Sequence, residues 1–311
     1  MLELDHVTKL YGTVLGVNDL DVSLPAGAYG LLGPNGSGKT TLINLITGQF
    51  RPTIGHVRVL GEDPFNSARL YRVLGVCPAA ETLYLNLSAH EWVTYLLRLH
   101  GFSSREAAAR ATQSLERAGL GEAMHRVMKG YSRGMRQRTK VAQAIAHDPQ
   151  VLVLDEPFNG LDPVGRHDLS SMLREWSSEG KLLILASHVL HEVEAITSSF
   201  LLISQGRLLA AGSSEEMQTL LADVPDEIYV SCSRAVPLAQ RILEDEAADA
   251  VRFDDQLGAL IVTTRSPLRI LEQLPVWAAQ FDTEIHELRS AHDSLDALFR
   301  ALVRKRRGER R

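Results

Sequence analysis

The strongest chemical signal in the sequence is a glycine-rich segment between an apolar strand pattern and an apolar helix pattern. Glycines let backbone N–H groups approach phosphate oxygens, and the following helix adds the positive end of its dipole. Lys39 is placed to reach the β- and γ-phosphates, and Thr40 to bind Mg²⁺. The segment predicts a nucleoside triphosphate site, with the binding residues Gly33, Pro34, Asn35, Gly36, Ser37, Gly38, Lys39, Thr40 and Thr41. A plain glycine-rich turn would not require Lys-Thr at its end.

Two adjacent carboxylates follow a second apolar strand pattern at residues 151–154. In that position Asp155 is expected to bind Mg²⁺ through water, and Glu156 to face the attacking water as a general base. Acidic pairs at strand ends also serve as helix caps or solvated charges. The phosphate-binding loop earlier in the same domain favours the catalytic interpretation.

A polar segment shortly before these carboxylates, residues 131–138, begins a helix pattern. Ser132 and Gly134 at a helix start suit anion recognition through hydroxyl and N–H donors. The segment resembles the signature of ABC ATPases, whose pattern is Leu-Ser-Gly-Gly-Gln. Ser132 and Gly134 match that pattern, whereas Tyr131, Arg133 and Met135 replace its other residues. The resemblance implies that Ser132 and Gly134 meet the γ-phosphate held by a second protomer.

Further segments resemble the same family, over about residues 1 to 218. Asp162, in Asn-Gly-Leu-Asp, resembles the D-loop aspartate, which implies a place between the two sites of a dimer. His188 follows an apolar strand pattern as the switch histidine does, which implies a hydrogen bond to the γ-phosphate and a catalytic role beside Glu156 and Lys39. Tyr11 resembles the aromatic residue that stacks on adenine. The sequence holds no Asn-Lys-x-Asp segment, which argues against a GTPase.

One position departs from the family in a consequential way. Residues 75–79 align with the segment that ends in Pro-Gln, the Q-loop, but Ala79 replaces the glutamine. An alanine methyl group cannot donate or accept a hydrogen bond as an amide does. We therefore expect metal contact, water positioning and the signal to a permease to be altered at this loop.

The elements that would position these residues alternate between strand and helix patterns, as in a mostly parallel sheet covered by helices. Strands are expected at residues 29–32, 73–77, 151–154 and 182–186. Apolar residues at helical spacing from Trp92 to Leu99, followed by an Ala- and Arg-rich helix, predict a helical subdomain over about residues 86–148. The α/β ATPase domain is expected to occupy residues 1–222.

A second, smaller domain is expected over residues 223–311, after the linker-like Asp223–Asp226. Its order of patterns, βαββαβ followed by a helix, predicts a ferredoxin-like α+β accessory domain. Residues 294–299 resemble the closing helix of related ATPase subunits. The basic segment 304–311 is read as a solvated tail rather than a lipid-binding one.

The amino-acid composition limits the class of protein, its partners and its cellular compartment. The chain has 311 residues, of which 45% are hydrophobic and 23% charged, which is ordinary for a folded globular protein. Its net charge of −5 provides no basic field for nucleic acid, so none is expected as a partner. Cys77 and Cys232 have no neighbours at metal-ligand spacing, which fits a reducing cytoplasm. Neither a signal peptide nor a membrane-spanning run is recognisable in the sequence.

These features together predict an Mg-dependent ATPase, the nucleotide-binding subunit of an ABC transporter. The expected partners are a membrane permease on another polypeptide and a second ATPase, either the same chain or a paralogue. The expected location is the cytoplasmic face of the membrane. The C-terminal extension and the form of the signature resemble ABC-2-type exporters. A soluble ABC-type regulator and a P-loop kinase are the alternatives; a kinase would lack the signature segment.

Overall fold

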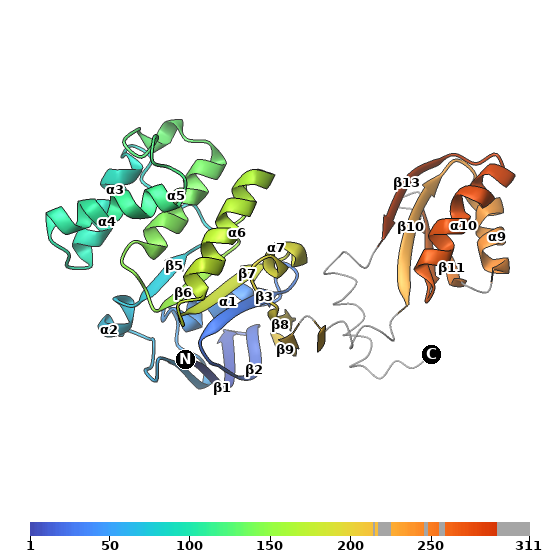
Figure 1. Ribbon diagram of the computed structural model, residues 1–311. Helices are drawn as coiled ribbons and strands as arrows, with labels where there is room; N and C mark the ends of the chain where they lie inside the picture. The colour runs from blue at the N-terminus through green and yellow to red at the C-terminus, as the bar shows by residue number, and fades with distance from the viewer. Residues whose placement is uncertain (214, 217–224, 246–247, 255–258, 291–311) are drawn as a thin grey trace. The chain divides into compact units, whose positions relative to one another are not determined.

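The computed structural model describes residues 1–213, 215–216, 225–245, 248–254 and 259–290 (Figure 1). The chain divides into two compact units, Met1–Ser214 and Glu215–Arg311. The expected boundary between residues 222 and 223 lies outside the described residues. So do the segment 294–299 and the basic segment 304–311.

The first unit contains a six-stranded sheet in the order β5-β6-β7-β3-β8-β9. Neighbouring strands are parallel except β8 and β9, which pair antiparallel. Its strands are β3 (Gly27–Leu32), β5 (Leu74–Cys77), β6 (Val151–Asp155), β7 (Leu182–Ser187), β8 (Ser199–Ser204) and β9 (Arg207–Ser213). Every residue of β6 and β7 is buried, which explains their nearly continuous apolar sequence.

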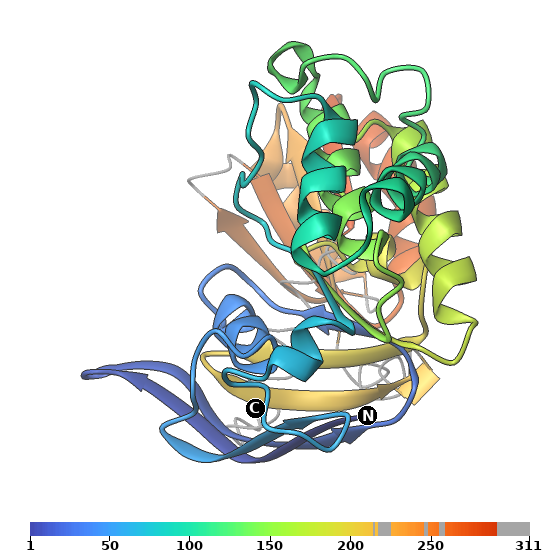
Figure 2. The same ribbon diagram turned by 90° about the vertical axis from the view of Figure 1, so that its left-hand side faces the viewer.

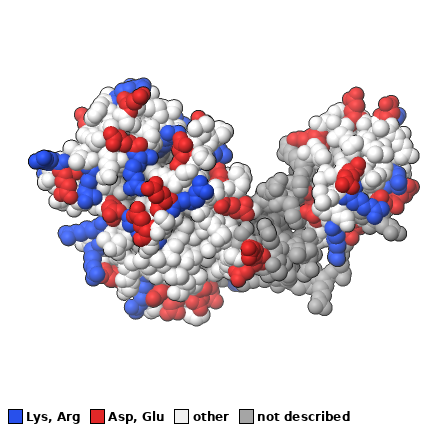
Figure 3. Space-filling model, viewed as in Figure 1, with Lys and Arg blue, Asp and Glu red and all other residues white. Residues whose placement is uncertain are grey.

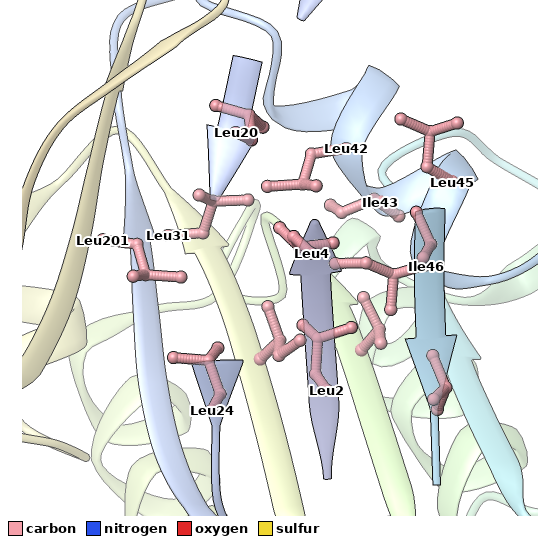
Figure 4. Close-up of a cluster of buried hydrophobic side chains, with 14 of the residues drawn as sticks. Leu2, Leu4, Leu20, Leu24, Leu31, Leu42, Ile43, Leu45, Ile46 and Leu201 are labelled. Carbon is pink, nitrogen blue, oxygen red and sulfur yellow. The ribbon is translucent and has the colours of Figure 1, made fainter. Parts of the chain in front are cut away.

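A second sheet in this unit is antiparallel, with three strands in the order β2-β1-β4. Its strands are β1 (Leu2–Tyr11), β2 (Val14–Leu24) and β4 (Ile54–Val59). Helix α1 (Lys39–Ile46) contacts β2 and β4 of this sheet and β6 of the other, so it packs against both sheets (Figure 2). Figure 4 shows the resulting core, in which Leu4, Leu31 and Ile43 bring the two sheets and the helix together. This burial anchors the helix that follows the phosphate-binding loop.

Three helices form a separate hydrophobic cluster that contains Trp92, Leu97, Leu115 and Met128. They are α3 (Ala89–Leu99), α4 (Ser104–Arg117) and α5 (Arg133–Ile145), with the 3₁₀ helix η1 (Met128–Gly130) before α5. Ser88 and Glu91 form a reciprocal capping box at the start of α3. Three short or peripheral helices complete the unit: α2 (Ala68–Tyr71), α6 (Pro163–Ser177) and α7 (Leu190–Glu194).

The parallel strands bring the predicted phosphate-binding and catalytic residues to one edge of the sheet. β6, β7 and β3 are adjacent, and their carboxyl ends lie at the same edge of the sheet. The phosphate-binding loop follows β3, the two carboxylates lie at the end of β6, and His188 follows β7. Ligands of open α/β sheets bind at this edge.

The second unit has the element order βαββαβ and an antiparallel sheet in the order β11-β12-β10-β13. Its elements are β10 (Asp226–Cys232), α9 (Ala235–Glu244), β11 (Ala248–Asp254), β12 (Ala259–Thr264), α10 (Pro267–Gln280) and β13 (Ile285–Ser290). Ile228 and Val262 from the sheet pack with Leu238 of α9 and Trp277 of α10. This unit therefore has its own hydrophobic core.

On the face of the first unit shown in Figure 3, basic and acidic side chains are interspersed rather than gathered into one field. Across the described residues, no helix is both long enough and apolar enough to cross a lipid bilayer.

Candidate nucleotide-binding site

The loop between β3 and α1 requires glycine at two positions for steric reasons. A Cβ on Gly33 would lie 2.4 Å from the backbone oxygen of Ile203. Gly38 has φ +107° and would place a Cβ 2.6 Å from the backbone oxygen of Gly16. At Gly36, by contrast, φ is +77° and a Cβ would meet nothing within 4 Å, so the loop faces open space there.

Lys39 is the first residue of α1 and is buried, with 7% of its surface exposed. Its Nζ donates hydrogen bonds to the carbonyl oxygens of Gly33, at 2.5 Å, and Pro34, at 3.2 Å. Burial lowers the pKa of Lys39, while the charges of Glu156 and Asp155 act in the opposite direction. The loop thus encloses an ammonium group beside two carboxylates.

Thr40 and Asp155 come from distant parts of the chain and meet at the sheet edge. The Thr40 hydroxyl donates to Asp155 Oδ2 at 3.4 Å. Burial, followed by the charge of Glu156, raises the pKa of Asp155, and Lys39 and the Thr40 hydrogen bond lower it. A hydroxyl and a carboxylate are the oxygen ligands that Mg²⁺ prefers, so the residues present fit that ion together with nucleotide phosphates.

Glu156 and His188 form the next pair along this edge. The Nδ1 atom of His188 lies 2.9 Å from both carboxylate oxygens of Glu156. The backbone of Glu156 has φ +51°, and its N–H donates to the carbonyl oxygen of Ala186 in β7 at 2.9 Å. A non-glycine residue in the left-handed region is uncommon and is typical of functional sites. The turn directs this carboxylate toward the histidine.

Tyr11 lies beside the first turn of α1. Its ring is 41% exposed and packs edge-on against Phe50, with the ring centroids 5.8 Å apart. The Tyr11 hydroxyl is 3.5 Å from the hydroxyl of Thr41. Lys9 Nζ lies over the same ring, 5.5 Å from its centroid, so Tyr11 is an exposed aromatic residue with a cation beside it.

The remaining predicted residues lie together in a different place. Ser132 caps α5 by accepting a hydrogen bond from the Met135 N–H, and Asp162 caps α6 by accepting one from the Gly165 N–H at 2.9 Å. Together with Gly134, these residues line a hollow of about 880 Å³. None of the described residues of the phosphate-binding loop lines it. One protomer therefore presents two groups of predicted residues at separate positions.

Two residues of α5 reach the site but were not predicted from the sequence. Gln137 Nε2 donates to the backbone oxygen of Glu156 at 3.4 Å. Lys140 Nζ donates to the carbonyl oxygens that follow β5, including that of Ala79 at 3.2 Å. The spacing of three along α5 places both side chains on one helix face, but their targets depend on how α5 packs on the sheet.

A family model and individual relatives identify the same protein family. Residues 17–159 match the family model described as ABC transporter. The daunorubicin/doxorubicin resistance ATP-binding protein DrrA of Streptomyces peucetius is 31% identical over 310 residues, which span 97% of this chain and 92% of that protein. The bacitracin transport ATP-binding protein BcrA of Enterococcus faecalis is 37% identical over 220 residues, 70% of each chain.

Solved structures agree with this result. An ATP-binding subunit of an ABC transporter superposes with a TM-score of 0.64 at 26% identity, over 70% of this chain and 92% of that one. A dimeric ATP-binding cassette, bound to ADP and Pi in a post-hydrolysis state, shares the fold with a TM-score of 0.64 at 22% identity, over 68% of this chain and 98% of that one. The chain belongs to the family of ABC transporter ATP-binding proteins and is an ATPase.

Proposed function

We propose that this chain is the motor subunit of an exporter and acts on a membrane permease encoded as a separate polypeptide. The observation that carries the proposal is the match to a resistance ATP-binding protein along 97% of the chain, which includes the second unit as well as the ATPase unit. The Nod factor export ATP-binding protein I of Cupriavidus metallidurans is also 34% identical over 249 residues, 78% of this chain and 82% of that protein. Attachment to such a permease would hold the chain at the cytoplasmic face of the membrane.

Within the ATPase unit, we assign the chemistry to the edge of the parallel sheet. Lys39 binds the β- and γ-phosphates, and Tyr11 stacks on adenine. Glu156 orients and deprotonates the attacking water, and His188, 2.9 Å from that carboxylate, contacts the γ-phosphate. Glu156 and His188 are hydrogen-bonded partners at the carboxyl ends of adjacent strands, which supports their joint role.

The metal site in this proposal consists of Thr40 and Asp155, whose side chains are hydrogen-bonded to each other. Mg²⁺, when bound, neutralises the charge that develops on the phosphates. Gly33, Asn35, Gly36, Ser37, Gly38 and Thr41 complete the cradle through backbone and side-chain donors. Pro34 has no N–H to donate, and its carbonyl oxygen accepts a hydrogen bond from Lys39.

We further propose that two copies of the chain share two ATP molecules. Ser132, Gly134 and Asp162 line a hollow of about 880 Å³ that the described phosphate-binding loop does not enter. These groups would then recognise the γ-phosphate held by the other copy. The positive end of α5 and its N-terminal serine suit that anion.

The second unit is proposed to be a ferredoxin-like regulatory domain. The order βαββαβ and the sheet order β11-β12-β10-β13, with antiparallel neighbours, support this assignment. All the residues assigned to phosphate chemistry belong to the first unit, which supports a regulatory rather than a catalytic role for the second.

Purification of the tagged full chain from native membranes tests the proposed attachment to a separate permease. We expect an integral-membrane protein to be retained with the tagged chain and its presence to change the rate of ATP hydrolysis. A chain recovered free of integral-membrane proteins, with the ATPase rate unaffected by membrane extract, would contradict the proposal. The Lys39→Ala protein serves as the control for background hydrolysis.

A further inference from the structure

Helix α5, which begins with the signature segment and is called the signature helix below, carries a buried lysine, Lys140. This lysine contacts the loop after β5, in which Ala79 replaces the glutamine of the family. Lys140 lies in the middle of α5 and only 3% of its surface is exposed. Its Nζ donates to three consecutive carbonyl oxygens, those of Pro78 at 2.8 Å, Ala79 at 3.2 Å and Ala80 at 3.1 Å. An ammonium group has three N–H donors, so each is used on this loop.

Burying an ammonium group costs free energy unless all its N–H donors have hydrogen-bond partners. The position of Lys140 therefore depends on the carbonyl groups that it contacts. Lys140 is not placed to activate the nearby thiol, because burial raises the pKa of Cys77 to about 12 in spite of the lysine charge. Its partners are backbone oxygens of a loop whose residues Ala79 and Ala80 expose their own side chains. The lysine therefore contacts the main chain of this loop rather than its side chains.

The helix that carries Lys140 is closely packed on the strand before this loop. A Cβ on Gly75 of β5 would lie 2.2 Å from the backbone oxygen of Ala144, so the helix and strand backbones are in contact. One turn before Lys140, Gln137 donates to the backbone oxygen of Glu156 at 3.4 Å. One face of α5 thus holds both the loop after β5 and the residue proposed as general base.

We propose that Lys140 is a positioning residue that fixes residues 78–80 against the signature helix through their carbonyl groups. It thereby supplies a connection between helix and loop that the side chain of Ala79 cannot make. The inference rests on the proposed site at the end of β6, because the loop and Glu156 are held by the same helix. Movement of α5 would be transmitted to the loop directly through the main chain.

The test combines kinetics with a probe on the loop. A nitroxide is attached to Ala80→Cys in a Cys232→Ser background, where the buried Cys77 should take up no label, as the same background without Ala80→Cys verifies. Lys140→Met removes the donors but keeps most of the length of the side chain. We expect increased mobility at position 80, a kcat about ten- to a hundredfold lower and a KM for ATP within about twofold of the parent.

Lys181→Met is the matched control. Lys181 is partly buried and bonds Asp148 and Glu179, but it precedes β7, at the opposite end of that strand from His188. Its loss should leave loop mobility and kcat unchanged. Lys140→Arg, which keeps the charge and several donors, should restore part of the immobilisation and of kcat in parallel.

A Lys140→Met protein with an immobile label, or with a mobile label and unchanged kcat, would overturn the proposal. If circular dichroism shows that this variant does not fold, Lys140→Gln takes its place and the same two readings apply. The label requires no hydrolysis, so an inactive parent chain would count against the proposed ATPase site and leave the loop measurement to decide the role of Lys140.

Discussion

Lys39 at the sheet edge interacts favourably with two adjacent carboxylates, which repel each other. Lys39 is buried beside two carboxylates, and these carboxylates counteract the effect of burial on its pKa. Asp155 has its pKa raised by burial and by Glu156. Removal of one partner would leave an uncompensated charge in a partly dry site.

Two substitutions at this edge should have distinguishable effects. Lys39→Ala should weaken ATP binding, because the phosphates lose a charged donor, whereas Glu156→Gln should retain binding and lower kcat by about 10²–10⁴-fold. Equilibrium binding of a fluorescent ATP analogue and steady-state hydrolysis measure the two quantities. Turnover in Glu156→Gln close to that of the parent would remove the residue from its assigned role.

Ala79 provides a second prediction at this scale. Its side chain is exposed and its backbone is held by Lys140, so a longer side chain should be accommodated without a change in the loop. Ala79→Gln would add an amide that can contact Mg²⁺ or water, and we expect ATP turnover to rise by a few fold. Rates are compared with and without the permease fraction, with Ala79→Leu as the control for bulk. Equal rates for all three forms would show that this position has no part in hydrolysis.

Most of the proposed site residues follow from local sequence patterns because they occur in contiguous segments. The residues of the phosphate-binding loop, Asp155 and Glu156 follow from local patterns, and the structure brings Lys39, Thr40, Asp155, Glu156 and His188 to one sheet edge. Gln137 and Lys140 could not be predicted in this way, because their partners are backbone atoms about 20 and 60 residues distant in sequence.

At the scale of elements, central strands were easier to predict than the antiparallel sheet. β6 and β7 are buried on both faces, so their apolar runs are unmistakable. β1 and β2 were not predicted, because their pairing is interrupted by register shifts and by His6 and Asp19 with positive φ, which disturb the two-residue alternation. The helices α3 and α4 begin at Ser caps; apolar spacing predicts the first, and an Ala- and Arg-rich composition predicts the second.

A buried histidine at the junction between α5 and β5 should make the stability of the folded chain fall at acid pH. His147 Nε2 lies 3.2 Å from the Leu74 carbonyl oxygen, and burial lowers the pKa of this histidine to about 4. The unfolded chain, with a histidine pKa near 6.5, therefore takes up the proton first as the pH falls. This contribution to stability is complete above about pH 6.5 and is lost between about pH 6.5 and about pH 4, with a total of about 3 kcal/mol.

Urea denaturation of the full chain at pH 7 and pH 5 measures this effect. His147→Gln keeps a donor for the Leu74 carbonyl but does not titrate, so its free energy of unfolding should fall less than that of the parent between the two pH values. An equal fall in both proteins would mean that His147 does not account for the acid sensitivity.

At the scale of the whole molecule, the chain consists of two units with separate hydrophobic cores, and the proposed chemistry belongs to the first. A chain that ends at Ser214 should therefore fold, bind ATP and hydrolyse it at a rate within a few fold of the full chain. Thermal unfolding and ATPase assays of the two proteins provide the comparison. A truncated chain that melts cooperatively but does not bind ATP would show that the second unit completes the site.

The proposed mechanism requires a site shared by two chains, because Ser132, Gly134 and Asp162 line a hollow separate from the described phosphate-binding loop of the same chain. Light scattering of the purified Glu156→Gln protein, with and without MgATP, tests this most directly, since slow hydrolysis preserves the ATP-bound state. We predict a mass close to twice 34.3 kDa with MgATP and a monomer without it, and a monomer again when Ser132→Arg blocks the signature. A protein that binds MgATP and remains a monomer at concentrations well above the Kd for nucleotide would contradict the account.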